Sequence, residues 1–253
     1  MTIIRLQEGN GYPDTVPEGE SVCNRCGHCV AVCPHGALSH TKIPIEDCPT
    51  IKKKLSINEK QAVQFLRSRR SIRFYKDKPV EKEKIQRLIE VARYAPTGGN
   101  SQLVEWLVLR DKSKINKIAS LTINWIRQVL KEDPQGVVRA PYLPLIVKAW
   151  EAGYDSVLRN APVLVVASTR VEVINGMVDL TLALSYLDLV APTMGLGTCW
   201  AGLLQGALLS SPSLKEILGI PEQHPRHYPM MLGYPRVKYY RLPGRKPPKI
   251  TFK

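Results

Sequence analysis

Apolar residues in the middle of the chain recur with the spacing of one helix face. Ile85, Leu88, Ile89 and Ala92 fall at positions i, i+3, i+4 and i+7, so their side chains share one side of a helix. Pro96 follows four residues later, and proline is poorly tolerated inside a helix. The pattern therefore predicts an amphipathic helix that ends before Pro96.

Similar patterns elsewhere predict further helices, separated by short apolar runs that are typical of strands. Helices are predicted over residues 58–70, 112–130 and 178–190 and from 212 onward, and strands over 103–109, 163–167 and 230–232. We expect the helix over 178–190 to be fully buried, and residues 134–144, with three prolines, to form a loop or lid. Helices and strands that alternate in this way predict a layered α/β or α+β fold.

The longest apolar stretch, residues 177–204, contains Asp179 and Asp188. A membrane span needs roughly 20 consecutive apolar residues, so a buried helix fits this stretch better. Residues 1–10 lack the basic start and apolar run of a signal peptide. We therefore expect no membrane span and a cytoplasmic protein.

The chain carries a formal net charge of +14, and this excess is unevenly distributed. Residues 1–55 contain six Lys/Arg and six Asp/Glu, so the whole excess lies in residues 56–253. Such a charge favours acidic partners, among them nucleic acid, anionic membranes and phosphorylated ligands, or it serves solubility alone.

Five of the six cysteines fall between Cys23 and Cys48. Residues 23–34 read Cys-Asn-Arg-Cys-Gly-His-Cys-Val-Ala-Val-Cys-Pro, which is the C-x2-C-x2-C-x3-C-P ligand run of bacterial ferredoxins. Two-residue gaps let one loop bring successive thiolates to neighbouring irons of a cluster. Zinc sites more often use two separated pairs of ligands, so the run favours iron–sulfur over zinc.

The number of thiols limits the number of clusters. No cysteine precedes the run, and five thiols cannot supply the eight ligands of two clusters. The sequence therefore predicts one iron–sulfur cluster, of the [4Fe–4S] type. Cys23, Cys26 and Cys29 are predicted ligands, and the fourth is Cys33, as a member of the run, or alternatively Cys48.

A polar connection that contains Pro44, Pro49 and three successive lysines ends near residue 55. We therefore expect two domains, with residues 1–55 as the iron–sulfur domain and residues 56–253 as the main domain. The last residues, 234–253, carry seven Lys/Arg and no acidic residue, and we expect them to form an extended tail.

Three short motifs in the main domain carry a further resemblance. Residues 67–75 read Arg-Ser-Arg-Arg-Ser-Ile-Arg-Phe-Tyr, residues 95–102 read Ala-Pro-Thr-Gly-Gly-Asn-Ser-Gln, and residues 195–200 read Gly-Leu-Gly-Thr-Cys-Trp. In this order and at these distances, they resemble the three motifs of the FMN-dependent nitroreductase family, in which a ferredoxin-like N-terminal domain is a known arrangement. The resemblance implies an α+β fold, a three-layer sandwich with helices around a mixed sheet, beside a small ferredoxin-like domain. It also implies an intertwined homodimer with FMN at the interface.

The chemistry of each motif suits a part of FMN. Guanidinium forks and a hydroxyl in the first motif suit a dianionic phosphate, and the glycines of the second and third motifs allow close backbone approach to the flavin. The resemblance adds an asparagine at the polar edge of the ring and a last phosphate-binding arginine in the tail. The predicted cofactor-binding residues are Arg69, Arg70, Ser71, Arg73, Pro96, Thr97, Gly98, Asn100, Gly195, Leu196, Gly197 and Arg245. We assign no catalytic general acid, since water or a substrate proton can complete the transfer.

The resemblance implies an FMN-dependent oxidoreductase that reduces a small organic acceptor of the nitroaromatic, quinone or enone type. Its electrons would arrive singly through the cluster, from a ferredoxin-like donor or a flavodoxin, or directly from NAD(P)H. The alternative is an electron-transfer protein that serves a protein partner and has no small substrate. A nucleic-acid-binding iron–sulfur protein is less favoured, because the FMN phosphate accounts for part of the basic charge.

Overall fold

The computed structural model describes residues 3–6, 11–133 and 140–253 of the chain. By its internal contacts the chain divides into two compact units. The first unit is Met1–Asn58 together with Thr97–Gln102, and the second is Glu59–Pro96 with Leu103–Lys253. The N-terminal unit thus ends at Asn58, and it includes most of the second motif.

Short elements and turns make up the first unit. Strands β1 (Ile4–Leu6) and β2 (Pro13–Thr15) pair antiparallel, with Arg5 opposite Asp14. Helix α1 (His28–Val32) lies inside the cysteine run, and single 3-10 turns follow at Ile45–Asp47 and Lys53–Leu55. Residues without helix or strand join these elements.

The second unit contains the remaining helices and strands of the described chain. Its helices are α2 (Glu59–Ser68), α3 (Lys82–Ala92), α4 (Lys112–Glu132), α6 (Leu143–Glu151), α7 (Gly176–Val190), α8 (Gly202–Ser210) and α9 (Pro212–Leu218), and its strands are β3 (Glu105–Leu109), β4 (Val163–Thr169), β5 (Gly197–Trp200) and β6 (Arg226–Gly233). Two further 3-10 turns lie at Gly98–Asn100, in the segment assigned to the first unit, and at Ala191–Met194.

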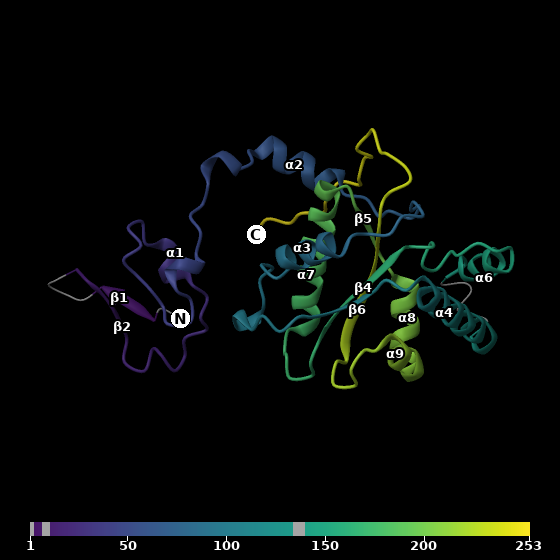
Figure 1. Ribbon diagram of the computed structural model, residues 1–253, viewed down its shortest axis with the longest axis horizontal. Helices are drawn as coiled ribbons and strands as arrows, with labels where there is room; N and C mark the ends of the chain where they lie inside the picture. The colour runs from purple at the N-terminus through teal and green to yellow at the C-terminus, as the bar shows by residue number, and fades with distance from the viewer. Residues whose placement is uncertain (1–2, 7–10, 134–139) are drawn as a thin grey trace. The chain divides into compact units, whose positions relative to one another are not determined.

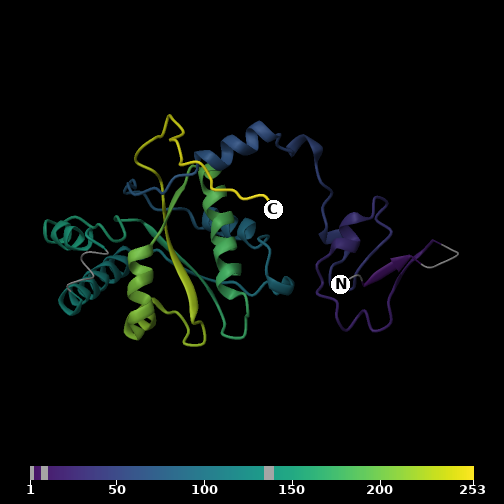
Figure 2. The same ribbon diagram turned by 180° about the vertical axis from the view of Figure 1, so that it is seen from behind.

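Four strands form the sheet of the second unit, in the order β3-β4-β6-β5, and every neighbouring pair is antiparallel. β4 is buried along its whole length, and its side chains alternate between two faces. Leu164 and Val166 pack in a core cluster with α4, α6, α8 and α9, whereas Val163 and Val165 pack in a second cluster with α3 and α7. Figures 1 and 2 show these helices on opposite sides of the sheet, so the unit is a three-layer sandwich.

Most of the predicted elements of this unit are confirmed. The helix that ends before Pro96 is α3, and the apolar runs 163–167 and 230–232 belong to β4 and β6. α2, α4 and α9 also form where the pattern predicts them. The hydroxyl of Ser211 accepts a hydrogen bond from the Leu214 N–H and so caps the N-terminus of α9. Helices therefore surround the sheet as the α+β prediction requires.

The prediction of a fully buried helix over residues 178–190 is wrong in one respect. α7 forms there, and it packs one face against α3 and the sheet, so that Leu180, Leu184 and Leu187 are buried. Its opposite face is also apolar but remains exposed, with Met177 41% and Val178 58% exposed. Helical periodicity cannot separate these two faces when both carry apolar residues.

The segment Gly176–Met194 is long and apolar enough to cross a membrane by length and composition alone. Its packing against α3, β4 and β6 is instead that of a core helix of the layered unit. Of the predicted lid, residues 134–139 lie outside the described residues. The remainder leads directly into α6, which begins at Leu143.

Candidate functional site

The cysteine run occupies the loop around α1 in the first unit. All six cysteines of the chain carry free thiols, and four of the five in this unit are partly buried, while Cys26 is exposed. The Ala37 N–H donates a hydrogen bond to Cys33 Sγ at 3.2 Å. Backbone N–H groups, first that of Ala37 and then that of His35, lower the pKa of the Cys33 thiol. N–H groups around this sulfur therefore favour the thiolate, the form that binds iron.

Two other predicted ligands have distinct surroundings. Cys23 Sγ lies 3.8 Å from Nε2 of His40, whose Nδ1 accepts a hydrogen bond from the Lys42 N–H. Cys48 ends a 3-10 turn and donates its backbone N–H to the Ile45 carbonyl. Within residues 3–6, 11–133 and 140–253, no three His, Cys, Asp or Glu side chains converge closely enough to hold a single metal ion. The donor set nevertheless fits an iron–sulfur cluster, since it offers thiols with backbone N–H groups beside them.

The second motif forms a tight turn in the first unit. Gly99 and Asn100 both have positive φ angles, of 60° and 56°. Thr97 accepts hydrogen bonds from the Asn100 N–H on its carbonyl and from the Gln102 N–H on its hydroxyl. The Asn100 side-chain amide donates to the carbonyl oxygens of Asn24 and Arg25, at 3.0 and 2.9 Å. The asparagine predicted at the flavin ring thus binds the backbone of the cysteine run.

The first and third motifs meet in the second unit. The Ile72 N–H donates a hydrogen bond to the Thr198 carbonyl at 2.8 Å. Gly197, the first residue of β5, is packed so closely that a Cβ there would lie 2.3 Å from Ile72 Cγ1 and 3.0 Å from Pro235 Cγ. A side chain at this position would force the two segments apart. The glycine of the third motif therefore lets the first motif pass beside β5.

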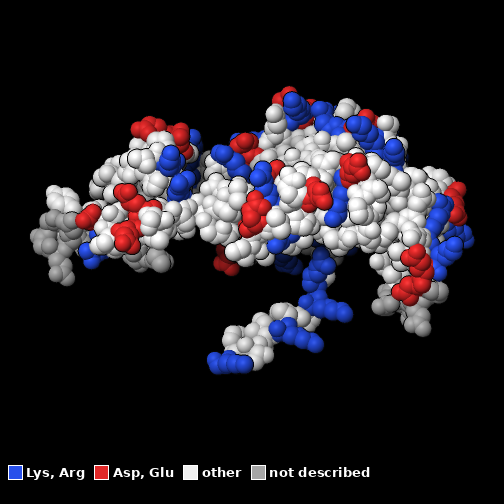
Figure 3. Space-filling model, turned by 90° about the horizontal axis from the view of Figure 1, so that it is seen from below, with Lys and Arg blue, Asp and Glu red and all other residues white. Residues whose placement is uncertain are grey.

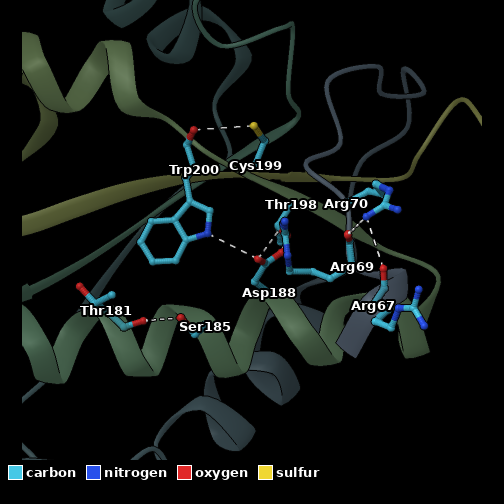
Figure 4. Close-up of polar contacts among 9 residues, drawn as sticks. All are labelled: Arg67, Arg69, Arg70, Thr181, Ser185, Asp188, Thr198, Cys199 and Trp200. Atoms are coloured by element: carbon cyan, nitrogen blue, oxygen red, sulfur yellow. Dashed lines mark hydrogen bonds and ion pairs between the residues drawn. The ribbon is translucent and has the colours of Figure 1, made fainter. Parts of the chain in front are cut away.

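A buried carboxylate joins the same two motifs. Asp188 of α7 is 4% exposed, and its Oδ2 accepts hydrogen bonds from Arg69 Nη1 and Trp200 Nε1, both at 3.4 Å. Its Oδ1 accepts a hydrogen bond from the Thr198 hydroxyl. Figure 4 shows the three partners directed toward this carboxylate. One acidic side chain thus binds Arg69 of the first motif and two residues of the third.

The other residues of the first motif differ in their environment. Arg70 turns back and donates from Nη1 to the Arg69 carbonyl at 2.7 Å, as Figure 4 shows. Arg73 is exposed. Burial raises the pKa of the Cys199 thiol, and the Arg73 charge and a hydrogen bond with Ser71 partly oppose that rise. Ser71 and Arg73 therefore lie near Cys199 of the third motif.

The backbone of the third motif begins with a sharp turn. Gly195 follows the 3-10 turn Ala191–Met194 with a φ of 74°, a conformation that glycine adopts without strain. Leu196 is 1% exposed and belongs to the core, so its side chain does not line an open site. Trp200 packs edge-on against Tyr228, with ring centroids 5.1 Å apart. Cys199 is 4% exposed and belongs to the core, so both side chains pack within the fold.

The predicted phosphate ligand of the tail lies apart from these contacts. Residues 236–253 are exposed and contain no helix or strand, and Arg245 lies within them. The beginning of the tail is held where the Arg236 N–H donates to the Phe74 carbonyl and the Lys76 N–H donates to the Tyr234 carbonyl. In Figure 3 the tail projects with Lys and Arg along it and without acidic residues.

Asp188 is the site residue that sequence reasoning did not identify. The sequence carried one signal for it, because two acidic residues, Asp179 and Asp188, interrupt an apolar helix whose other buried side chains are leucine and alanine. A carboxylate inside such a helix needs hydrogen-bond partners from elsewhere in the fold. Its partners, however, lie 119, 10 and 12 residues away, so only the folded chain reveals them.

Comparisons with known proteins agree with both parts of the chain. The family model described as the nitroreductase family matches residues 66–234, and that of a 4Fe-4S binding domain matches residues 19–39. A putative NADH dehydrogenase/NAD(P)H nitroreductase of Archaeoglobus fulgidus is 26% identical over 70% of this chain and 86% of its own length. The FMN reductase (NAD(P)H) of Bacillus subtilis is 27% identical over 69% of this chain and 66% of its own length.

A solved structure has the same fold as the second unit. The nitroreductase with bound FMN from Bacteroides fragilis superposes with a TM-score of 0.61 at 22% identity, covering 78% of this chain and 99% of its own. The family match spans well over half of the sequence and includes the first and third motifs. The chain therefore belongs to the nitroreductase family of FMN-dependent oxidoreductases, and it carries a 4Fe–4S binding domain near its N-terminus.

Proposed function

We propose that this protein reduces a small organic acceptor at an FMN bound by the three motifs, with electrons supplied through one [4Fe–4S] cluster on the cysteine run. The observation that carries the proposal is the meeting of the first and third motifs. The Ile72 N–H donates to the Thr198 carbonyl, and Arg69 and Thr198 both donate to the Asp188 carboxylate. A bound FMN stores two electrons, whereas a cluster passes one at a time. One chain that combines the two sites can join one-electron donors to two-electron chemistry.

Residues of the first motif fit the phosphate of FMN. Arg69 keeps 32% of its side chain exposed, Arg73 is exposed, and Ser71 adds a hydroxyl nearby. Guanidinium groups bind phosphate through paired N–H donors, and they do so without losing their charge. We assign these three residues to the phosphate, together with Arg70 and the tail residue Arg245. Their task is to bind and orient the cofactor.

The polypeptide backbone of the other motifs serves the flavin ring. We assign the backbone of Gly195, Leu196 and Gly197 to the side of the ring where charge builds up on reduction, because positive backbone dipoles near that side stabilise an anion. The N–H groups of Gly195 and Leu196 donate to the Pro192 and Ala191 carbonyls, so their contribution is that of an ordered turn. We also assign to the flavin the residues of the second motif, namely Pro96, Thr97, Gly98 and Asn100. Gly197 supports this role, because the absence of a side chain already lets Ile72 approach its backbone closely.

We assign the cluster to Cys23, Cys26, Cys29 and Cys33. The hydrogen bond from the Ala37 N–H to Cys33 Sγ and the lowered pKa of that thiol support Cys33 as the fourth ligand over Cys48. If this choice is correct, Cys33→Ser lowers the iron content per chain and Cys48→Ser leaves it unchanged. The reverse result would assign the fourth position to Cys48.

The acceptor is a nitroaromatic, a quinone or an enone, and the donor is a ferredoxin, a flavodoxin or NAD(P)H. The names of the relatives from Archaeoglobus fulgidus and Bacillus subtilis both include NAD(P)H, which supports a test of that donor first. Steady-state reduction of each acceptor class, with each donor in turn, identifies the working pair. A cytoplasmic location belongs to the same proposal.

We also propose that two copies of the chain associate. Two helices of the second unit expose apolar side chains, namely Val63 and Leu66 on α2 and Met177, Val178 and Tyr186 on α7. Exposed apolar faces of this kind mark interfaces, and the family builds its FMN site between two subunits. Sedimentation should therefore give the mass of a dimer, and a monomer that retains FMN would contradict the proposal.

The first experiment is to purify the protein anaerobically and to measure iron, sulfide and FMN per chain. We expect about four irons, four sulfides and one FMN. Iron without FMN would contradict the flavin site, and FMN without iron would contradict the electron relay. As a second step, Arg69→Ala and Arg73→Ala should weaken FMN retention, whereas Arg87→Ala, at an exposed arginine of α3, should not.

A further inference from the structure

The buried carboxylate of Asp188 accepts three side-chain hydrogen bonds, which a residue that only filled space in the core would not need. Its side chain is only 5% exposed, and an ion buried to that degree is costly unless other groups bind it. The Thr198 hydroxyl binds Oδ1, and the Arg69 guanidinium and the Trp200 indole N–H bind Oδ2. Both oxygens therefore have partners, and one of these partners is charged.

These partners come from two motifs that are far apart in the sequence. Thr198 and Trp200 are alternate residues of β5, so both side chains leave the strand on the same face, toward α7. Arg69 lies after the end of α2, and the Ile72–Thr198 backbone hydrogen bond holds its segment beside β5. Asp188 is thus the side chain through which α7, the first motif and the third motif are joined.

The geometry leaves much of the arginine exposed. Arg69 donates to Asp188 from Nη1, yet 32% of its side chain remains exposed. A guanidinium group has five N–H donors in a fixed plane. Holding one edge of that plane therefore fixes the direction in which the remaining donors point.

We propose that Asp188 is a positioning residue that holds the Arg69 guanidinium in the orientation that binds the phosphate of FMN. This inference rests on the proposed function, because it takes Arg69 as a phosphate ligand. Asp188 itself does not touch the phosphate, since two like charges in contact would repel each other. It acts on the arginine as a ligand-orienting carboxylate acts on the histidine of a metal site.

The competing explanation is that Asp188 only holds α7 against β5. In that case its loss would loosen the whole flavin site, the ring-binding part included. Riboflavin separates the two explanations, because it has the ring and ribityl chain of FMN but lacks the phosphate. A residue that acts through Arg69 affects FMN and leaves riboflavin unaffected.

The experiment is to titrate the flavin-free full-length protein with FMN and with riboflavin, in the wild type and in Asp188→Asn. We expect the variant to bind FMN about tenfold more weakly, which corresponds to about 1.4 kcal/mol, and riboflavin within about twofold of the wild type. Equal weakening of both ligands, or unchanged or tighter FMN binding, would overturn the proposal. Asp179→Asn, a buried carboxylate nine residues earlier on α7, is the matched control and should change neither affinity.

Two further variants keep the test decisive. If Asp188→Asn does not fold, Asp188→Leu suits the apolar pattern of α7 and removes the same charge, and the same selective loss is expected.

In an Arg69→Ala background, Asp188→Asn should cause no further loss of FMN affinity, because the arginine that Asp188 positions is gone. A further tenfold loss in that background would show that Asp188 acts by another route. If wild-type protein binds FMN no better than riboflavin, the phosphate site of the proposed function itself fails.

Discussion

The two units of this protein are stabilised in different ways. The second unit buries apolar side chains on both faces of its sheet, in two large clusters. In the described part of the first unit, Val30 is the only hydrophobic side chain in the buried core. A segment of about 60 residues with so little apolar burial needs cross-links or a metal to fold. The first unit should therefore depend on its cluster, whereas the second should depend on its core.

The sequence also provides separate signals for the two units. All four tryptophans, Trp106, Trp125, Trp150 and Trp200, lie in the second unit, and five of the six cysteines lie in the first. Tryptophan fluorescence therefore reports the second unit, while the visible absorbance of an iron–sulfur cluster reports the first. The loss of either unit can therefore be followed separately.

The largest effect is expected when the cluster is lost. Cys26→Ser should remove the iron–sulfur absorbance and leave residues 11–58 of the first unit unfolded, because metal binding supplies most of the folding free energy of such small domains. Limited proteolysis should then cut within residues 11–58 and leave the second unit intact. FMN should remain bound through the first and third motifs, and the tryptophan transition should shift little.

The control for this substitution is Cys199→Ala, which removes a thiol from the second unit and should leave the iron content unchanged. Loss of both iron and FMN in Cys26→Ser would contradict the contrast between the units. It would mean that the two fold as one cooperative body.

The second effect concerns the core of the sandwich. Leu184 of α7 is fully buried between the sheet and α3, so Leu184→Ala should lower the free energy of unfolding by about 2–5 kcal/mol. Denaturant unfolding followed by tryptophan fluorescence measures this loss, and iron per chain should not change. Leu209→Ala, at a position 64% exposed on α8, should cost less than about 0.5 kcal/mol. A similar loss in both variants would show that burial in this layer contributes little.

Much of the sandwich could be predicted because its core patterns are local. α3 was predicted from four apolar residues on one face, and β4 from a continuous apolar run, which is typical of a strand buried on both sides. β6 was predicted only in its last part. It begins at Arg226 and includes Pro229, and its pairing with β4 overrides the weak strand preference of those residues.

Other elements depend on contacts that the sequence does not display. α8 contains Gly202 and Gly206, which lower helix propensity, yet a Cβ on Gly206 would lie 2.9 Å from the Trp125 ring. The glycine is there for helix packing, and that reason is visible only in the folded chain. Asp188 was missed for the same reason, because its role depends on partners in β5 and after α2.

The candidate site also contains both residues that the sequence predicts and residues that only the folded chain reveals. The cysteine run was predicted from residue type and spacing, and the basic first motif from its resemblance to the family together with the chemistry of its guanidinium groups. The hydrogen bonds from Asn100 to Asn24 and Arg25 were not foreseen, because they join segments about 75 residues apart. Motifs supply candidate ligands, but the residues elsewhere in the chain that contact them are visible only in the tertiary structure.

A smaller effect is expected where the two motifs cross. Gly197→Ala would place a Cβ 2.3 Å from Ile72 Cγ1, so Ile72 or the backbone must move, at a cost of about 1–3 kcal/mol. We expect weaker FMN retention and a lower tryptophan transition, with normal iron content. Gly202→Ala is the control, since its Cβ would lie 3.7 Å from the Tyr228 hydroxyl, an ordinary contact. Unchanged FMN retention in Gly197→Ala would mean that the site tolerates separation of the motifs.

The smallest effect depends on pH and should be confined to the second unit. His227 of β6 is fully buried, its Nδ1 lies 3.3 Å from the His224 carbonyl, and within the described chain its Nε2 has no hydrogen-bond partner. Burial lowers the pKa of His227 below its ordinary value of about 6.5. The folded state therefore favours the neutral ring, and the unfolded state takes up a proton more readily.

The sign of the pH effect follows from that difference. The stability that neutral His227 contributes is fully present above the unfolded pKa of about 6.5, and it is lost as the pH falls from there toward the lowered folded pKa. His227→Gln cannot be protonated in this range, so it should lose less stability than the wild type between pH 7.5 and pH 5.5. Denaturant unfolding followed by tryptophan fluorescence at both pH values measures the difference, and His35→Gln in the first unit should leave it unchanged. Equal losses in the wild type and in His227→Gln would show that this buried histidine does not set the acid sensitivity of the sandwich.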